Sequence, residues 1–557
     1  MNGTVLEVPA VPAPSDAAPL RLNRTVPPVV LLLLITLFSG AATLLAMRRT
    51  SPTFDEIVLV AGGARGYHTG VFDLAPDHPP LTQYFYGLPV FLSGPTYPDE
   101  TAIDSVTQSA GGYRYFYAQQ FYYGVGNDPE LISFLGRLPA ALFAVLLVLM
   151  TFVVVRSRFG TNAALLAAAM VAFLPDVLAH GGVAYNDLPL TIGYLVALFA
   201  LDGAIRRPTL LRGLGAGLLT GIALGTKISA IALAPAAVLF LVMEAVARRR
   251  DREWRVAIAP AAIAALAGVY LALVAVFLGD FALSEFRYGL EFRFRHFTGG
   301  HGTNAYLLGR QSPTGWWYFF PVAFLFKTSA ALHLLMLIAA VAFVQDLVRD
   351  RAGALASHLR VPIIGVLVFG AVLLRSNLNI GFRYAMPLLP LFCVVTAVGI
   401  VRFWPRATRA LRVVIGVAGI WLVAQPLSYY PHFLAYISEY GPGRDRNYEV
   451  LIDSSLDWGQ GLLELRDFMR ANDIPRVYLG YFGSGVPSAY GIEYVPFQSF
   501  FTLATPPATN DAEPEWIVIS ASLLQGSYTV GDPFHELREV EPDAVIGHTM
   551  LAWRVRR

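Results

Sequence analysis

Long apolar runs alternate along the chain with short polar segments that are rich in arginine. About 20 apolar residues are needed to cross roughly 30 Å of hydrocarbon. One continuous helix over residues 211–247 would overshoot a bilayer, since a helix rises about 1.5 Å per residue, so two short helices are expected there. The pattern predicts a mainly α, polytopic bundle of about eleven transmembrane helices, near residues 28–47, 136–155, 162–179, 187–205, 211–226, 228–247, 256–278, 317–344, 361–375, 382–401 and 411–429.

The arginines predict the orientation of this bundle. Positive residues favour the cytoplasmic ends of spans, and arginine gathers in alternate connections, at 156–158, 206–212, 248–255, 349–360 and 402–412. The chain is therefore expected to span the cell (inner) membrane with its N-terminus in the cytoplasm. Three larger segments, 48–135, 279–316 and 430–557, are then expected on the outer face.

Three parts of the chain differ from the spans. Residues 1–27, rich in Ala and Pro, are expected to form a disordered cytoplasmic arm ahead of a membrane domain over 28–429. The aromatic run 113–123 is typical of a helix in the headgroup layer, with sugar stacking as the alternative. From residue 430 onward, a helical pattern at 461–471 and strand-like runs at 477–482, 516–520 and 544–555 predict a small extracytoplasmic α/β domain.

Composition excludes several classes of protein. Hydrophobic residues make up 55% and charged residues 14% of the 557 residues, with a mean hydropathy of +0.53, which a soluble domain of this size would not carry. A net charge of +2 is too small to indicate a nucleic-acid partner. The single cysteine, Cys393, excludes an intramolecular disulfide. No Gly-rich phosphate loop occurs, so a nucleotide-sugar donor is not expected.

An ordered set of motifs carries the candidate chemistry. The motifs are Phe54-Asp55-Glu56, His78-Pro79-Pro80-Leu81, Tyr185-Asn186-Asp187, Thr226-Lys227, the Tyr306 segment 304–309, Lys327-Thr328, Arg383-Tyr384-Ala385-Met386-Pro387 and residues 453–460. Together these motifs resemble glycosyltransferase family 39, which contains protein O-mannosyltransferases and aminoarabinose transferases of the GT-C fold, over about residues 50–490. Pro79 stands where the aminoarabinose transferases have a lysine, so the mannosyltransferases are the closer match.

The resemblance implies that a sugar moves from a polyprenyl-phosphate carrier to an acceptor hydroxyl on the outer face, with inversion and with Asp55 at the reaction centre. The chemistry agrees, because a phosphate leaves readily and the reaction then needs one carboxylate as general base and cations for the phosphate. Asp55 is predicted to be that base. Glu56 is expected to orient the acceptor or to hold Asp55 in place, the alternative being a solvated acidic pair on a loop.

Candidates for the phosphate come from the basic residues. Of the 41 residues that are Lys or Arg, only Lys227 and Lys327 are lysine, and both lie in apolar surroundings, where a charge usually faces a polar cavity or a partner. At least one of them is expected to bind the carrier phosphate, the alternatives being snorkelling or a structural pair with Asp187. Arg383 is the next candidate. His78 is expected either to bond the phosphate or acceptor or to sit in a rigid turn.

Residues at the third and fourth spans complete the predicted site. Tyr185, Asn186 and Asp187 are expected to contact the acceptor, a lysine or a metal, or else to cap the fourth helix, and Tyr306 is grouped with them. Residues 453–460 are expected to pack the tail onto the outer loops, the alternative being contact with the acceptor, and Asp457 is a candidate N-cap of the tail helix. No cofactor is required. A divalent cation is conceivable but not indicated, since Glu291, His296 and His301 lack regular spacing and a fourth ligand.

The predicted partners are the lipid bilayer, a polyprenyl-phosphate sugar and a protein, lipid or glycan acceptor, and no nucleic acid. The alternative function is a transporter or flippase of a lipid-linked substrate. That class usually distributes polar residues through several spans and often contains repeats. Here the polar groups gather toward one face and no repeat is evident.

Overall fold

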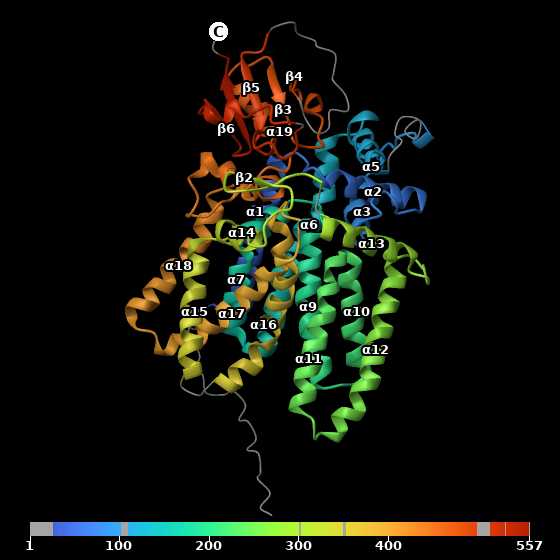
Figure 1. Cartoon of the computed structure of the whole chain (residues 1–557), viewed down its shortest axis with the longest axis vertical. Coiled ribbons are helices and arrows are strands. Elements are labelled where there is room, and N and C mark those ends of the chain that lie inside the picture. Colours follow the sequence, from blue (N-terminus) through green and yellow to red (C-terminus); the bar gives the residue numbers. More distant parts are fainter. Residues whose placement is uncertain are drawn as a thin grey trace, which may run out of the picture.

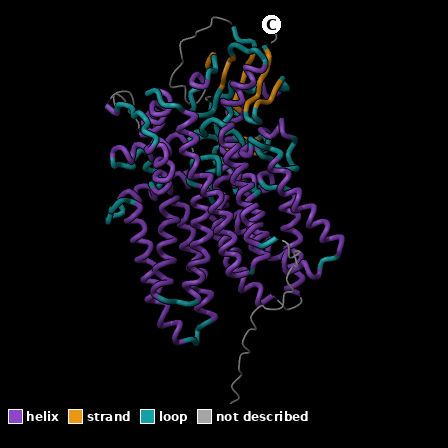
Figure 2. The backbone as a smooth tube through the Cα atoms, turned by 180° about the vertical axis from the view of Figure 1, so that it is seen from behind, coloured by secondary structure: helices purple, strands orange, loops and turns teal. Residues whose placement is uncertain are grey.

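The computed structural model describes residues 26–101, 110–299, 302–348, 352–497, 513–529 and 531–555. Most of the predicted arm, residues 1–27, therefore lies outside the described residues. A bundle of long helices occupies one end of the molecule and a small sheet occupies the other (Figure 1). Seen from behind, the strands gather at that one end while the rest of the described chain is helix and loop (Figure 2). The prediction of a mainly helical membrane chain with a small C-terminal sheet is confirmed.

Eight helices in the described part of the chain are long and apolar enough to cross a membrane, and three shorter apolar helices accompany them at Thr161–Ala172, Leu210–Thr226 and Leu359–Leu374. The prediction of eleven spans is thus confirmed in part. The eight long helices contain α1 (Pro28–Ala46), α6 (Pro129–Phe159), α9 (Asp187–Arg206), α11 (Leu233–Ala247), α12 (Arg252–Val276), α15 (Ala330–Val348), α17 (Leu389–Phe403) and α18 (Arg409–Leu427), and the shorter segment Leu359–Leu374 belongs to α16 (Ala352–Leu374).

Two predicted spans differ from the structure. The run 317–344 divides into α14 (Phe319–Lys327) and α15, because Thr328 adopts an extended conformation and ends α14. The run 162–179 divides into α7 (Thr161–Ala172) and α8 (Pro175–His180), since Pro175 cannot donate a helical hydrogen bond and starts a new helix. The pair predicted over 211–247 is present as α10 (Leu210–Thr226) and α11, joined by a short 3₁₀ helix, Ile228–Ala232.

Small residues bring α10 close to α12. A Cβ on Gly217 would lie 1.9 Å from the backbone oxygen of Ala265, and one on Gly213 would lie 2.1 Å from that of Ala261. Close backbone approach through small residues is the usual way in which apolar helices associate where lipid surrounds them. The short length of α10 is therefore compensated by its tight contact with the long helix α12.

The segments predicted to face outward lie together at the sheet end of the bundle (Figure 1). They contain α2 (Glu56–Thr69), α3 (Leu81–Leu92), α5 (Ala110–Gln119) and α13 (Ser284–Gly299), with a hairpin of β1 (Ala305–Leu307) and β2 (Arg310–Ser312). The aromatic run 113–123 is helical, as predicted, and continues from α5 into a wider helical turn, Gln120–Gly124. Its place in a headgroup layer stays a prediction.

The C-terminal sheet has the order β4-β3-β5-β7-β6, with β3 parallel to β4 and β5 and the remaining pairs antiparallel. Leu462, Leu465 and Met469 form the buried face of α19 against the sheet. The prediction missed β4, and the run 544–555 is two strands that reverse at Gly547 and His548, both with positive φ. The elements are α19 (Leu462–Ala471), β3 (Val477–Gly480), β4 (Tyr494–Pro496), β5 (Trp516–Ser520), α20 (Ala521–Leu524), β6 (Ala544–Ile546) and β7 (Met550–Arg554).

Candidate active site

A cavity of about 270 Å³ collects polar side chains from segments that are far apart in the sequence. Its lining comes from the start of α2, the loop before α3, α5, α13, the turn before α9, the segment before α17 and the C-terminal region. The lining residues are Phe54, Asp55, Val58, Leu59, Ala75, Asp77, His78, Arg114, Tyr115, Tyr185, Phe292, Arg293, Leu378, Ile380, Arg383, Tyr384, Asp453, Trp458, Phe482 and Tyr528.

Asp55 lies at the N-cap position of α2 and lines this cavity. Its side chain is 24% exposed, so a substrate can reach it. The Tyr115 hydroxyl donates to Oδ1 of Asp55 over 2.8 Å, and Nη2 of Arg383 lies 3.5 Å from Oδ2. The carboxylate is held between a phenol and a guanidinium and keeps lone pairs for a further hydrogen bond.

Glu56, the neighbour of Asp55, is completely buried and does not line the cavity. Arg137 holds it at both oxygens, with Nε 2.7 Å from Oε1 and Nη2 2.8 Å from Oε2. The backbone N–H groups of Thr53 and Ala184 also donate to this carboxylate over 2.9 Å. This geometry fits a group that holds the Asp55 turn, and it gives no support to contact between Glu56 and an acceptor.

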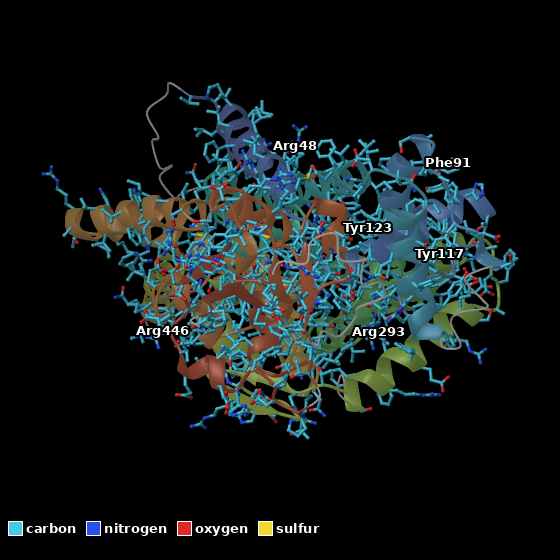
Figure 3. All side chains as sticks on the ribbon, turned by 90° about the horizontal axis from the view of Figure 1, so that it is seen from above. Arg48, Phe91, Tyr117, Tyr123, Arg293 and Arg446 are labelled. Carbon is cyan, nitrogen blue, oxygen red and sulfur yellow. The ribbon has the colours of Figure 1, made fainter. Side chains whose placement is uncertain are left out.

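Arg114 and Arg293 line the cavity and were not singled out from the sequence. Both pair with Asp77, at 2.7 Å from Nη1 of Arg114 and 2.8 Å from Nη2 of Arg293. Seen from above, Arg293 lies inward of the ribbon of α13, toward the middle of the molecule (Figure 3). The signal that could have found both residues is their position, because they are charged residues in segments predicted outside, where arginine is not needed as a topological anchor.

The Asp77–His78 turn is oriented by these arginines. Burial alone would raise the pKa of the Asp77 carboxyl, but the charges of Arg293 and Arg114 outweigh it and lower the pKa below its ordinary value. Burial lowers the pKa of the His78 imidazole well below its ordinary value, and Arg293 lowers it further. At neutral pH, His78 is therefore a neutral hydrogen-bonding group beside an ionised carboxylate. It lines the cavity, as its predicted role requires.

Arg383 is the most constrained cation of the cavity, with 3% of its side chain exposed. Its guanidinium carbon lies 4.4 Å from the ring centroid of Trp458 and 4.6 Å from that of Tyr185. Nε donates to Oγ of Ser454 over 3.0 Å, which ties α17's leading segment to the C-terminal region. A stacked, planar guanidinium has its donors aimed in fixed directions, which suits recognition of a phosphate.

The two lysines have structural partners. Nζ of Lys227 pairs with Oδ1 of Asp187 at 2.5 Å and lies 4.6 Å from the Tyr384 ring centroid, and it does not line the cavity. This is the structural pair considered as the alternative. Lys327 is completely buried and donates to the backbone oxygens of Leu434, Tyr436 and Ser455 over 2.8–3.1 Å. Because an ammonium has three N–H groups, Lys327 has none left for a phosphate.

The predicted acceptor residues fall into two groups. The Tyr185 hydroxyl lies 3.1 Å from Nε2 of His78, and Nδ2 of Asn186 lies 2.8 Å from Nδ1, so both residues orient the imidazole. Asp187 is buried 3.6 Å from Nη1 of Arg383, in addition to its pair with Lys227. Tyr306 does not line this cavity. Its hydroxyl donates to the backbone oxygen of Glu449, and the residue lines a smaller cavity that shares Ile380, Asp453 and Tyr528 with the main one.

Metal-ligating residues show no cluster of three or more within the described ranges. His301 and the side chain of His296 lie outside those residues, so the sequence-based expectation about a cation at Glu291, His296 and His301 stays a prediction. Asp457 was considered as an N-cap of the tail helix. In the structure Gly461 precedes α19, and the Asp457 carboxylate accepts instead from the backbone N–H of Ser522 over 2.9 Å.

Comparison with known proteins gives one family match. Residues 116–278 match the family model described as dolichyl-phosphate-mannose-protein mannosyltransferase. No curated protein matches the chain. Among solved structures, ArnT from Cupriavidus metallidurans bound to undecaprenyl phosphate has 13% identity and a TM-score of 0.48, over 94% of this chain and 97% of that one.

A second solved structure is the archaeal oligosaccharyltransferase AglB from Archaeoglobus fulgidus in complex with an inhibitory peptide and a dolichol-phosphate. It has 13% identity and a TM-score of 0.43, over 76% of this chain and 57% of that one. Both scores lie below 0.5, so the site is interpreted from its own residues. The family match confirms, over residues 116–278, the resemblance to lipid-phosphate-dependent glycosyltransferases that the motifs predicted.

Proposed function

We propose that this protein moves a single sugar from a polyprenyl-phosphate carrier to an acceptor hydroxyl on the outer face of the membrane, on a GT-C fold, with Asp55 as general base. Ligand cavities in proteins commonly measure roughly 300–1,000 Å³, and this one, at about 270 Å³, is at the small end. A cavity of this size suits one sugar with its phosphate. The donor and acceptor named in the family description, dolichyl-phosphate mannose and a protein, are the first substrates to test.

One observation carries the proposal. A partly exposed carboxylate, Asp55, lies 3.5 Å from the buried guanidinium of Arg383, in a cavity that Arg114 and Arg293 also line. In the proposed reaction the acceptor oxygen bonds to the anomeric carbon of the sugar, and the bond from that carbon to the phosphate oxygen breaks. The acceptor proton goes to Asp55, while the electron pair of the broken bond stays on the phosphate.

The arginines would stabilise the charge that builds up on the departing phosphate. Groups that are already oriented before the reaction stabilise the transition state without a reorganisation cost. Arg383 is held by aromatic stacking and by Ser454, and Arg293 and Arg114 are held by Asp77. Attack from the face opposite the phosphate would give the inversion that the resemblance implies.

The remaining predicted residues have supporting roles in this proposal. Tyr115 holds the Asp55 carboxylate, and Tyr185 and Asn186 orient His78, which lines the same cavity. We infer that the buried pair of Lys227 and Asp187 helps to position Arg383, because Asp187 lies 3.6 Å from its guanidinium. The transporter or flippase alternative has no observation in its favour, since the ionisable groups of this cavity come from the outward loops and helix ends.

The test uses the full-length protein in detergent or liposomes, with polyprenyl-phosphate monosaccharides and a membrane extract as the source of acceptors. General-base catalysis is commonly worth about 100- to 10,000-fold, so Asp55→Asn should lower transfer by at least about 100-fold. Its affinity for the lipid phosphate should stay within about threefold of wild type. Asp467→Asn, at an exposed position on α19, is the matched control and should transfer normally.

A wild-type protein that transfers from none of the lipid-phosphate sugars would refute the proposed function. Normal transfer by Asp55→Asn would refute the assigned base while leaving the donor class intact. The two results are therefore separable.

A further inference from the structure

The cavity lining contains a second group of side chains that the reaction above does not use. Phe54, Phe482 and Tyr528 form a stack, with ring centroids 5.3 Å apart for the first pair and 4.4 Å apart for the second. Interplanar angles of 21° and 30° make this a row of nearly parallel rings. Aromatic rings at a wet site offer an apolar face together with a polar edge, which matches the apolar C–H face of a sugar ring.

Asp453 stands at the Tyr528 end of this stack and lines the same cavity. Its carboxylate accepts from the Tyr528 hydroxyl and from the backbone N–H of Ser454, and the residue is 5% exposed. Asp453 also has a φ of +53°, in the left-handed region that side chains other than glycine seldom adopt. Such a conformation persists only where the surroundings impose it, and it is concentrated at ligand sites.

Burial of the Asp453 carboxylate would be explained if this group binds a ligand. Burial raises the pKa of the Asp453 carboxyl to about 6, against the lowering effects of the Tyr528 hydrogen bond and of Arg383. At neutral pH the group is therefore mostly ionised despite its desolvation. Its two oxygens offer about four acceptor sites, and the two contacts just named leave acceptor capacity toward the cavity.

We propose that Asp453 and Tyr528 bind the hydroxyl groups of the donor sugar, so that this part of the C-terminal region determines which sugar is accepted. The inference rests on the proposed function. It adds a donor-sugar subsite supplied by the extramembrane tail, where the sequence predicted packing for residues 453–460, with acceptor contact as the alternative.

The same geometry favours the donor sugar over the acceptor. Arg383 donates from Nε to Ser454, the residue next to Asp453, and its Nη2 lies near Asp55. The sugar of the donor is joined directly to the phosphate that Arg383 would hold. A ring bonded to that phosphate would share the cavity of about 270 Å³ with Asp453 and the aromatic stack, which form part of its lining.

The experiment compares two probes on the full-length protein: bare polyprenyl phosphate, and the polyprenyl-phosphate monosaccharides of a panel that includes mannose. Loss of a hydrogen bond to a charged group typically changes affinity by about 10- to 100-fold. Asp453→Asn and Tyr528→Phe should weaken binding of the preferred sugar-bearing lipid by about 10-fold or more. Both variants should bind the bare lipid phosphate as wild type does, and should discriminate less among the sugars.

Tyr478→Phe is the matched control, because its hydroxyl bonds Glu513 on the far side of the same sheet domain and does not line the cavity. Equal loss of both probes would indicate a folding defect and would overturn the assignment. So would unchanged affinity for the sugar-bearing lipid with a raised KM for the acceptor. If wild type bound bare and sugar-bearing lipids equally and transferred none, the proposed function and this subsite would fall together.

Discussion

Lys227 and Lys327 illustrate how the surroundings of a residue decide its role. Both are buried lysines at helix ends, and the sequence around them is similarly apolar. Lys327 is surrounded by backbone oxygens, while Lys227 pairs with Asp187, which in turn lies 3.6 Å from Arg383. The scarcity of lysine indicated both positions, but only Lys227 is linked to the candidate site.

Lys327→Met should therefore be a stability variant. It leaves three buried carbonyl groups without a donor, and each unsatisfied group costs about 1–3 kcal/mol. We expect a clear fall in Tm in detergent, with the affinity of the folded protein for the lipid phosphate unchanged. Lys227→Met is the comparison and should lower both quantities. A selective loss of lipid binding in Lys327→Met, at unchanged Tm, would restore its predicted phosphate role.

The pH dependence of stability should contain a signature of Asp453. Its pKa is raised from 3.8 to about 6, so the folded protein binds this proton more tightly than the unfolded chain does. The stabilisation is complete below pH 3.8 and is lost as the pH rises through about 6. Within that interval it changes by on the order of 1 kcal/mol per pH unit.

Thermal unfolding of wild type and Asp453→Asn at about pH 4.5 and pH 7 would measure this contribution. Between the lower and the higher pH, the Tm of the variant should fall less than the Tm of wild type. Burial raises the pKa of Asp457 to about 7, and the charge of Asp453 contributes to that rise, so Asp457→Asn is measured alongside as a second comparison. Parallel pH profiles for the two proteins would contradict the assignment of this proton to Asp453.

At the scale of single elements, α13 shows how helical periodicity separates a site residue from a surface residue. Residues two positions apart lie on opposite sides of a helix. Arg293 points inward to Asp77, whereas Arg295 is 75% exposed and pairs with Glu291 on the same helix. The sequence Phe-Arg-Phe-Arg-His contains both arginines, and nothing within it tells which one faces the cavity.

Arg293→Gln and Arg295→Gln form a matched pair on this helix. The first should weaken binding of polyprenyl phosphate by about 10- to 100-fold, because a charge-assisted hydrogen bond to the phosphate is removed. The second should change binding by less than about threefold, as exposed pairs on one helix contribute little. Binding can be followed by titration of the purified protein at constant ionic strength. Equal effects of the two substitutions would remove Arg293 from the phosphate site.

At the scale of the whole molecule, the site is a meeting point of segments that the membrane bundle holds at one end. The connection between α11 and α12 lies at the opposite end of the bundle from the sheet (Figure 1). The sheet end carries the candidate site, and the far end carries arginine-rich connections such as 248–255. The orientation predicted from arginine would therefore place the whole site on the outer face.

Cysteine labelling can test this orientation cleanly, since the native Cys393 is buried. Glu515→Cys beside β5 and Arg250→Cys between α11 and α12 would introduce thiols at exposed positions. In intact cells a membrane-impermeant maleimide should label the first and should reach the second only after permeabilisation. Wild type is the unlabelled control. Labelling of Arg250→Cys alone in intact cells would reverse the topology and place the site in the cytoplasm.

The sequence by itself determined the apolar spans, the helical class, the presence of a small terminal sheet and the position of Asp55, because these depend on local periodicity and on motifs a few residues long. Tertiary structure alone decided which cations meet that carboxylate. Arg114, Arg293, Arg383 and Asp453 are separated by long stretches of chain and share one cavity. Glu56 and Lys327 are turned into structural anchors by partners equally distant in sequence. The physical reason is that a charge buried in a membrane protein is satisfied by whatever the fold brings beside it, and no local pattern records that neighbour.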